Sequence, residues 1–600
     1  MITNRLLSLF ALVGAAVAWV DVDPDLIPAL DEPLPVFSLG EPSFIPDDWL
    51  ESVVGHTGKK PKFVKRSSDD PKVYIYDGDE VVGFVDKSTG ETRVFPDYGT
   101  LKPCDKPVDI NKALSLFEKG SDAFPADDTG IELTRGSSLQ GGEVADAPPT
   151  EGSGSNYRRW NDTVIPPAAS PDLTYLTLGT VTRSVKVGDQ TFPVCGPGSQ
   201  ASFGVGPENK VVSLSYQWKP ATKTNKLQHA LPAGHIAEYI QAALEPKVVL
   251  TQAEGIKVYH VDTCFYDSGV SYLQPVYRVL AEPYDHTNTT ADDRKKFVEY
   301  IPIDGDGAET IPSGEGTANV AGGASPDEPS TSDNTRRSFL NYFEARQGLT
   351  APTITVGRYV VRNDSDGFVE DARNFWTSLS TSPTYNFVNS QYYWAFDWLY
   401  KENAQSFVNS VDLALTEAHG GFHRFSTYKG SAAEKDGGVH IPADLPTDGF
   451  GPISNSGKGK LSYWFIDACE VIPSSFDFQA IDDPNPQRRA FDPWWPVFRG
   501  GIHAVVGWRT SALFSDNTAS RTAAAIALGR PVVSAWLDAA HTDPAYKNKP
   551  TYTGGGTGIE DWPLGRAAAV FRCGRASDKV VDRQNLGAPT CLSIRYWNND

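Results

Sequence analysis

The second half of the chain constrains the fold most, because from residue 338 apolar segments of strand length alternate with segments of helical periodicity. Strands are predicted over 353–361, 411–418, 460–468 and 501–510, and helices over 368–379, 391–410 and 518–540. The strand segments are apolar on both faces, which is typical of parallel strands covered on both sides. The pattern predicts an α/β domain over about 338–545, with a parallel-dominated sheet flanked by helices.

The first half of the chain has shorter alternating segments with turns at Asp-Gly and Thr-Gly, which predict small α+β modules. A chain of 600 residues is long enough for several domains. The predicted order is a signal peptide (1–18), a Pro/Asp-rich segment (19–66), an α+β module (67–137), a linker (138–170), a second α+β module (171–303), a flexible linker (304–337), the α/β domain (338–545) and an extension (546–600).

The N-terminus predicts secretion. Arg5 precedes an apolar stretch that ends in the small-x-small motif Ala16-Val17-Ala18, as in a signal peptide with its cleavage site. No later stretch reaches about eighteen apolar residues, so we expect an extracellular protein without a membrane partner. The N-glycosylation motif occurs at Asn161, Asn288 and Asn363.

The formal net charge of −21 bears on the choice of partner. A polyanion repels nucleic acid and anionic lipid surfaces. We therefore expect no nucleic acid partner.

Six cysteines in an oxidising compartment favour disulfide bonds. Cys573 and Cys591 lie in one short terminal segment, and Cys195 and Cys264 lie in one predicted module, so each couple is a plausible pair. A bridge between the remaining Cys104 and Cys469 stays open, but a free Cys469 is the more economical interpretation.

Two dibasic steps are candidate processing sites for secreted proteases. Lys65-Arg66 ends the Pro/Asp-rich segment, and an ordinary solvated charge pair explains it equally well. Arg336-Arg337 lies at the end of the flexible linker, directly before the α/β domain. Its position favours Arg337 as the cleavage point.

Two predicted strands end in reactive side chains about fifty residues apart, the first in His419-Gly420 and the second in Asp467-Ala468-Cys469. Ligands of open α/β sheets bind beyond the carboxyl ends of the strands. If the two strands are neighbours, the imidazole can take the proton of the thiol and produce a nucleophilic thiolate. The backbone N–H groups of Gly420 and Cys469 would then face a developing oxyanion.

Other interpretations of these residues stay open. A free cysteine is often a small buried hydrophobe, and a single histidine is often structural. The motif HGGFH (residues 419–423) pairs His419 with His423, but its two glycines disfavour a helix and HExxH is absent. We therefore expect no metal site and no cofactor.

An apolar strand ending in His-Gly, followed by an apolar strand ending in acid-Ala-Cys, resembles the caspase–legumain–gingipain–separase clan of cysteine peptidases. The resemblance covers about 200 residues and includes GIHAVVGWRTSALFSDN with the Ala-rich helix that follows. It implies a caspase-like sheet, with His419 as general acid/base, Cys469 as nucleophile and Gly420 as an oxyanion donor. The strand and helix pattern of residues 171–303 resembles the PepSY-like propeptide modules that precede many secreted peptidases.

The resemblance also implies where the substrate pocket lies. Asp467 stands where the clan often has Gln or Glu, and it either shapes the pocket or caps the strand end. Beyond the next strand, Asp516 would select a basic substrate side chain and Arg509 an acidic one. Asp516 is preferred, and Arg509 has the alternative of pairing with a neighbouring carboxylate.

Two functions from different classes follow. The first is a secreted cysteine endopeptidase made as a zymogen, which cleaves peptide or protein substrates and whose N-terminal modules cover the cleft as an inhibitor. The second is a catalytically inactive binding or surface protein on a caspase-like scaffold, because a fold does not guarantee a function.

Overall fold

The structure is a computed structural model, and it describes most of the chain between Trp19 and Asn598. The described residues are 19–54, 60–104, 109–111, 114–115, 123–145, 172–251, 254–284, 295–311, 352–361, 366–428, 437–514, 516–547, 551–552 and 562–598. The predicted signal peptide, the three predicted glycosylation sites (Asn161, Asn288 and Asn363) and the processing residue Arg337 lie outside the described residues.

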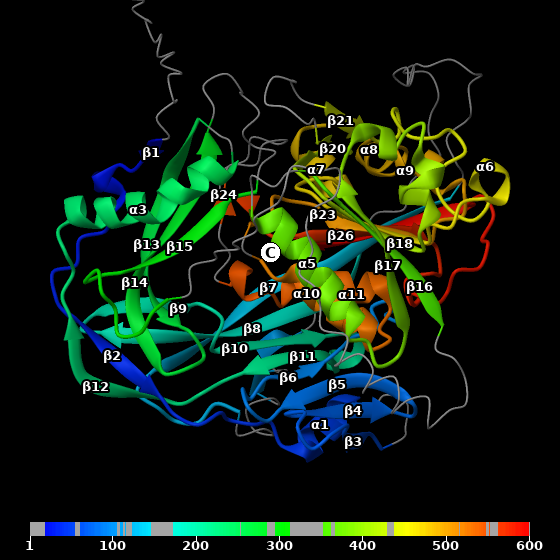
Figure 1. Cartoon of the computed structure of the whole chain (residues 1–600). Helices are drawn as coiled ribbons and strands as arrows, with labels where there is room; N and C mark the ends of the chain where they lie inside the picture. The colour runs from blue at the N-terminus through cyan, green and yellow to red at the C-terminus, as the bar shows by residue number, and fades with distance from the viewer. Residues whose placement is uncertain are drawn as a thin grey trace, which may run out of the picture.

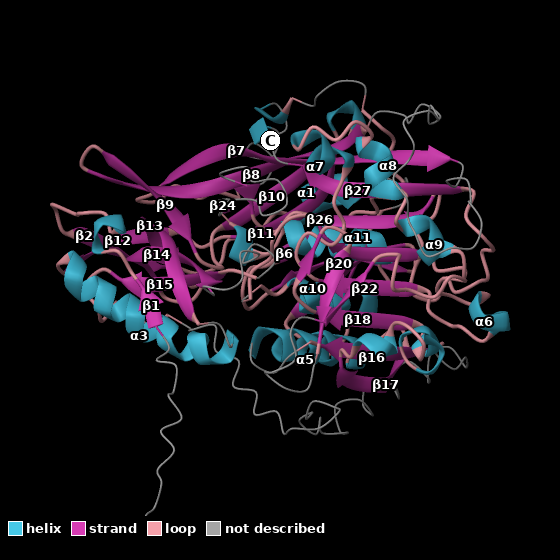
Figure 2. Cartoon of the chain, turned by 90° about the horizontal axis from the view of Figure 1, so that it is seen from above, coloured by secondary structure: helices cyan, strands magenta, loops and turns pink. Residues whose placement is uncertain are grey.

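Five parallel strands form the sheet of the C-terminal half (Figure 1). Their order across the sheet is β17 (Asn386–Trp394), β16 (Thr353–Val360), β18 (Leu413–Glu417), β22 (Tyr463–Asp467) and β23 (Ala504–Trp508). The antiparallel strand β26 (Ala567–Arg572) follows β23. Figure 2 shows this succession of strands from above.

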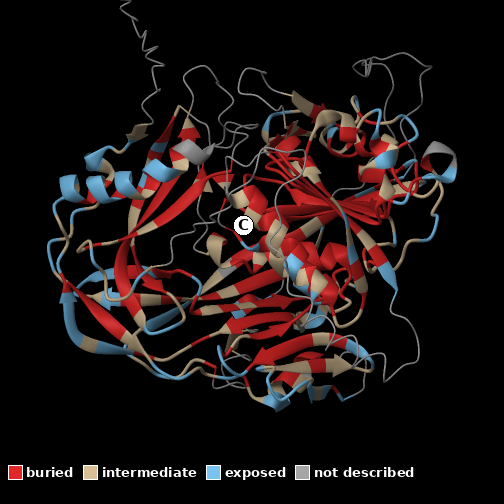
Figure 3. Ribbon diagram, in the orientation of Figure 1, coloured by how far each residue is buried: buried red, intermediate tan, exposed pale blue. Residues whose placement is uncertain are grey.

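Both faces of the central strands are covered, because successive side chains point to opposite sides. Every residue of β18, β22 and β23 is buried (Figure 3). Phe465 packs against Phe375 of α5 (Asp366–Ser380) and Trp536 of α11 (Val532–His541), whereas Trp464 packs against Tyr400 and Phe450. The predicted α/β class with helices beside parallel strands is confirmed at this level.

Two of the predicted helices are wrong in part. Residues 391–410 are not one helix: the segment begins inside β17, whose exposed and buried residues largely alternate, and continues through short 3-10 turns. The aromatic residues at its start fit a pleated strand better than a helix. The segment 518–540 is divided into α10 (Thr518–Ala527) and α11, because Gly529 at φ +87° and Pro531 interrupt it.

The same sheet continues into the N-terminal half, which corrects the predicted organisation. Beyond β26 come β27 (Cys591–Asn598), β7 (Gly130–Ala145) and β8 (Leu173–Val187). Strand β7 runs through the predicted boundary at residue 137, and β26 and β27 make the predicted C-terminal extension part of the sheet. Hydrogen bonding across sequence-distant strands, which no local pattern encodes, joins the predicted modules.

The sheet ends in further antiparallel strands. They are β10 (Gln200–Val205), β11 (Val211–Gln217), β6 (Thr92–Val94), β5 (Glu80–Asp86), β4 (Lys72–Asp77) and β3 (Lys62–Lys65). The pairing of β6 with β11 means that the two predicted α+β modules share one sheet.

A further group of strands, joined to this sheet through residues 190–195, packs against the helix α3 (Ala233–Thr251). Its strands are β1 (Trp19–Asp21), β2 (Leu34–Leu39), β9 (Gln190–Cys195), β12 (Ala221–Gln228), β13 (Gly255–Asp267), β14 (Tyr272–Tyr284) and β15 (Phe297–Pro302). The smaller elements are α1 (Asp47–Val54), β19 (Gly420–Gly421), β20 (Arg424–Thr427), β21 (Gly437–His440), α6 (Ser454–Gly457), α7 (Ser475–Ala480), α8 (Pro486–Phe491), α9 (Trp494–Phe498), β24 (Thr551–Tyr552) and β25 (Trp562–Pro563).

Two disulfides are present, Cys195–Cys264 and Cys573–Cys591, as the cysteine positions predicted. Cys104 and Cys469 are free thiols. Disulfides of this kind are typical of proteins that fold in an oxidising compartment. Within the described residues, no helix combines the length and apolar character needed to cross a bilayer.

Candidate functional site

The register of β18 and β22 brings the two predicted strand ends together. Glu417 pairs with Asp467 as the last residues of the two neighbouring parallel strands. His419 and Cys469 each follow two residues later, and Ala418 N–H donates to the Asp467 carbonyl oxygen at 3.2 Å. The imidazole and the thiol therefore belong to matching positions at the carboxyl edge of the sheet.

Gly420 allows the two chain segments to touch. A Cβ atom at this position would lie 2.8 Å from Ala468 Cβ and 3.0 Å from Cys469 N, and it would collide with the Cys469 carbonyl oxygen. The absence of a side chain thus lets the backbone after His419 lie directly against the backbone of Cys469. This contact is the structural reason for the glycine that follows the histidine.

We predict that Gly420→Ala lowers the melting temperature, because the added methyl group pushes the two strand ends apart at a cost of about 1–3 kcal/mol. Circular dichroism during heating measures the change. Gly234→Ala is the matched control, since no atom lies within 4 Å of a Cβ at that position of α3. Equal melting temperatures for Gly420→Ala and the unmodified chain would contradict the close approach described above.

The thiol of Cys469 is enclosed. The residue has no exposed surface, and its Sγ accepts a hydrogen bond from Ala512 N–H at 3.3 Å. Burial raises the pKa of this thiol to about 12, and the hydrogen bond from Ala512 offsets only part of that rise. Cys469 is consequently a protonated thiol at neutral pH in this conformation.

His419 lies in an aromatic corner and is partly exposed. Its ring meets Phe368 edge to face with a centroid distance of 5.0 Å, and Phe514 with a distance of 6.1 Å. Phe368 and Phe514 also contact each other. These rings restrict the orientation of the imidazole and exclude water from one side of it.

A cluster of buried carboxylates lies at the same edge of the sheet, and a single lysine enters it. Lys295 Nζ lies 3.1 Å from Asp467 Oδ1, and 3.6 Å from both Glu417 Oε2 and Asp371 Oδ2. The lysine and Glu417 have no exposed side-chain surface. Asp371 is contributed by α5, so three separate chain segments supply these carboxylates.

Asp516 completes the group, which we call the acidic cluster (Asp371, Glu417, Asp467 and Asp516). It accepts a hydrogen bond from the Tyr546 hydroxyl at 2.5 Å. Burial, followed by repulsion from Asp467, raises the pKa of Asp516 to about 8. Burial also raises the pKa values of Asp371 and Glu417. Burial by itself lowers the pKa of Lys295, but the surrounding carboxylates outweigh it and raise this pKa above its usual value.

The segment that carries this lysine, Lys295–Phe297, comes from the N-terminal half and is called the covering segment. Lys296 N–H donates to the Ala512 carbonyl oxygen, and Phe514 N–H donates to the Lys296 carbonyl oxygen, both at 3.1 Å. Phe297 stacks on Phe514 at 4.8 Å. The covering segment therefore runs along residues 512–514, the stretch that also donates a hydrogen bond to Cys469.

Arg509 takes the alternative that the sequence left open and pairs with a carboxylate. Its Nε donates to both carboxylate oxygens of Asp477 at 2.9 Å, and its Nη1 donates to the Trp597 carbonyl oxygen at 2.7 Å. The side chain is fully buried. Arg509 thus supports the fold, and only Asp467 and Asp516 of the three predicted pocket residues belong to the acidic cluster.

Sequence reasoning missed Asp371, Glu417 and Lys295. Glu417 had a usable signal, because it occupies the strand-end position that corresponds to Asp467. Asp371 lies on an amphipathic helix, where a carboxylate is expected on the solvent side. No local pattern predicts that Lys295 is buried, since its partners lie more than seventy residues away in the sequence.

Two other predicted residues lie outside this site. His423 is partly buried, and its ring stacks on Phe478 with a centroid distance of 5.9 Å. Burial lowers the pKa of His423 to about 3, so the ring is neutral at physiological pH. Arg66 follows β3, where it packs over the Tyr74 ring and donates to the Tyr76 hydroxyl, so its side chain is partly buried.

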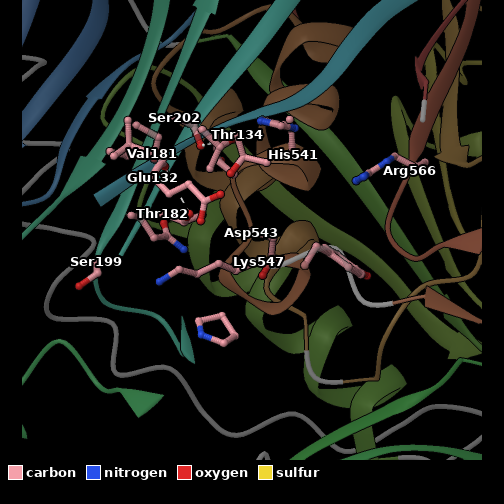
Figure 4. Close-up of a pocket in the computed structure, with 18 of the residues that line it drawn as sticks. Glu132, Thr134, Val181, Thr182, Ser199, Ser202, His541, Asp543, Lys547 and Arg566 are labelled. Atoms are coloured by element: carbon pink, nitrogen blue, oxygen red, sulfur yellow. Dashed lines mark hydrogen bonds between the residues drawn. The ribbon is translucent and has the colours of Figure 1, made fainter. Parts of the chain in front are cut away.

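A cavity of about 340 Å³ lies between the N-terminal strands and the segment after α11 (Figure 4). Glu132, Thr182, Ser202 and Lys547 are among its lining residues, whereas His419 and Cys469 are not. Burial lowers the pKa of Lys547 to about 8, and its ammonium donates to the Gly198 carbonyl oxygen. The cavity is thus separate from the paired strand ends.

Comparison with known proteins gives one family match. Residues 354–556 match the family model of a domain of unknown function, DUF6345. The match begins in β16 and extends past Cys469 and the acidic cluster. No curated protein and no solved structure matches the chain.

Proposed function

We propose that the chain is a secreted cysteine endopeptidase made as a zymogen, with Cys469 as the nucleophile and His419 as the general acid/base. The observation that carries the proposal is the register of β18 and β22, which gives the imidazole and the thiol matching positions on neighbouring strands. The parallel sheet with flanking helices supports the resemblance to the caspase–legumain–gingipain–separase clan. Gly420, packed against Cys469, is the candidate oxyanion donor.

The proposed reaction is acyl transfer through a thioester. His419 takes the thiol proton, and the thiolate attacks the carbonyl carbon of the scissile peptide bond. The imidazolium then gives its proton to the leaving amine as the C–N bond breaks. Water adds to the thioester, and its hydrolysis releases the carboxylic acid and restores the thiol.

The zymogen part of the proposal is supported by the enclosure of Cys469. A thiol with a pKa of about 12 is unreactive near neutral pH, and the covering segment lies along residues 512–514, which contact this thiol. Cleavage after Arg337 would leave the two halves joined through β7 and β27. Activation therefore requires displacement of the covering segment as well as chain cleavage.

The alternative is an inactive secreted binding protein. If the covering segment never moves, Cys469 stays buried, and this alternative is favoured. A cysteine without exposed surface is also what a purely structural residue would look like. The two functions differ in whether any processed form exposes a reactive Cys469.

A thiol-reactive peptidyl probe tests the proposal on the intact chain, on the chain cleaved after Arg337, and on the cleaved chain carrying Lys295→Ala. We expect probe attachment at Cys469 in a processed form, its loss in Cys469→Ala and a strong decrease in His419→Ala. The controls are Cys104→Ala, which removes the other free thiol, and His440→Ala, which removes an exposed histidine. Absence of labelling in all three forms would favour the inactive binding protein.

A further inference from the structure

The acidic cluster has an unusual charge balance for the interior of a protein. Four carboxylates surround one ammonium group, and all five groups are buried. Within the described residues, neither carboxylate oxygen of Glu417 receives a hydrogen bond. Buried carboxylates normally have hydrogen-bond donors, as Asp467 has in the Trp508 indole N–H and Asp516 in the Tyr546 hydroxyl. Glu417 instead faces the ammonium group of Lys295, so its carboxylate is compensated by a cation.

The cation comes from outside the segments that form the cluster. Lys295 belongs to the N-terminal half, and its ammonium group is fully enclosed. The Phe368 ring lies 5.1 Å from its Nζ and lines the apolar side of the space. Carboxylates and an aromatic ring around the same ammonium group match the chemistry of a lysine or arginine side chain.

The neighbouring lysine shows that the enclosure of Lys295 is specific. Lys296 is also buried, but its Nζ pairs with Glu282 at 3.0 Å, which belongs to the N-terminal sheet. The two lysines thus point to different partners, and only Lys295 enters the cluster beside Cys469. The backbone of the same segment is bound by residues 512–514, through an isolated parallel bridge between Lys296 and Leu513, as an extended peptide would be.

We propose that the acidic cluster is a binding pocket for a lysine or arginine side chain of the substrate, and that Lys295 is the chain's own occupant of this pocket. The inference rests on the proposed peptidase function. Lys295 excludes the substrate side chain until the covering segment moves, and the substrate then replaces the buried ammonium group. The pocket accordingly has a cation in both states, which avoids leaving four buried carboxylates without compensation.

The pocket is tested without catalysis in the full chain carrying Cys469→Ala. Lys295→Ala removes the ammonium and three methylene groups, which is the size of n-propylammonium. We expect n-propylammonium to raise the melting temperature of the Lys295→Ala variant in a saturable manner, and 1-propanol to have no such effect. Lys296→Ala is the matched control, because its loss leaves the cluster intact, and it should show no rescue. The pocket would be overturned if 1-propanol raised the melting temperature as much, or if n-propylammonium stabilised Lys296→Ala equally. It would also be overturned if n-propylammonium left the melting temperature of a folded Lys295→Ala chain unchanged.

A second measurement tests the pocket even if the Lys295→Ala variant does not fold. The cleaved chain with its native Lys295 is given peptides that differ only in the residue before the scissile bond. We expect kcat/KM for lysine or arginine to exceed that for methionine or glutamate by at least about tenfold, since a buried anionic site rejects neutral and acidic side chains. Hydrolysis without this preference overturns the pocket and leaves the peptidase, whereas n-propylammonium rescue without any hydrolysis supports the pocket and overturns the peptidase.

Discussion

Iodoacetamide is expected to alkylate Cys469 in the intact chain about a thousandfold more slowly than an exposed cysteine at pH 7.5. The reacting species is the thiolate, and a pKa of about 12 leaves roughly a thousandfold less of it than the ordinary value near 9. The rate should continue to rise as the pH increases from 7 to 10, because the thiol is still mostly protonated there. Mass spectrometry of the Cys469 peptide over time measures the rate.

The second free thiol provides the internal control for this experiment. Cys104 is partly exposed, so its alkylation in the same sample reports the activity of the reagent. A Cys469 rate that levels off near pH 8 or 9 would mean that the thiol is solvated in the intact chain. Displacement of the covering segment should expose the thiol, so the alkylation rate of Cys469 should then level off near pH 8 or 9. The same measurement therefore reports activation.

Arg509→Met is expected to destabilise the chain by about 3–5 kcal/mol, because it leaves the carboxylate of Asp477 buried without its cation. The arginine makes two hydrogen bonds to Asp477 at 2.9 Å, and the Phe476 and Tyr596 rings lie against its guanidinium. Methionine replaces the stem of the side chain but none of these hydrogen bonds. Thermal unfolding followed by circular dichroism measures the loss.

A substitution of Asp477 distinguishes the contribution of the ion pair to stability from the contribution of side-chain packing. Asp477→Asn in the Arg509→Met background removes the unpaired charge, so we expect the double variant to recover part of the lost stability. Arg499→Ala is the surface control, since this arginine is exposed and donates to the Thr447 carbonyl oxygen rather than to a carboxylate. A melting temperature for Arg509→Met equal to that of Arg499→Ala would mean that the pair contributes little.

The position of Arg509 also explains why the sequence could not decide between a pocket residue and an ion-pair partner. Both Arg509 and Asp516 follow β23, and either charge at that edge was compatible with a pocket. The structure directs Arg509 toward α7 and β27, whereas Asp516 lies among the other carboxylates. The direction of a side chain after the end of a strand depends on the local turn and on distant partners, which sequence spacing does not contain.

The sequence by itself determined the parts of this protein that depend on local periodicity. Apolar runs at 411–418 and 460–468 predicted strands buried on both faces, and these became β18 and β22 with His419 and Cys469 at matching ends. The helix over 368–379 was predictable in the same way, whereas both disulfide pairs were predicted from cysteines that share one short segment or one module. Short-range pattern suffices here, because side-chain burial follows the pitch of the strand or helix.

Only the tertiary structure decided how the halves of the chain combine. The pairing of β27 with β7 joins residues more than four hundred positions apart, and Lys295 meets carboxylates from three distant segments. Such contacts arise from the closure of long loops and from the neutralisation of buried charge, and neither leaves a periodic trace in the sequence. The position of the Lys295 ammonium group beside Cys469 therefore depends on the tertiary structure and could not be predicted from the sequence.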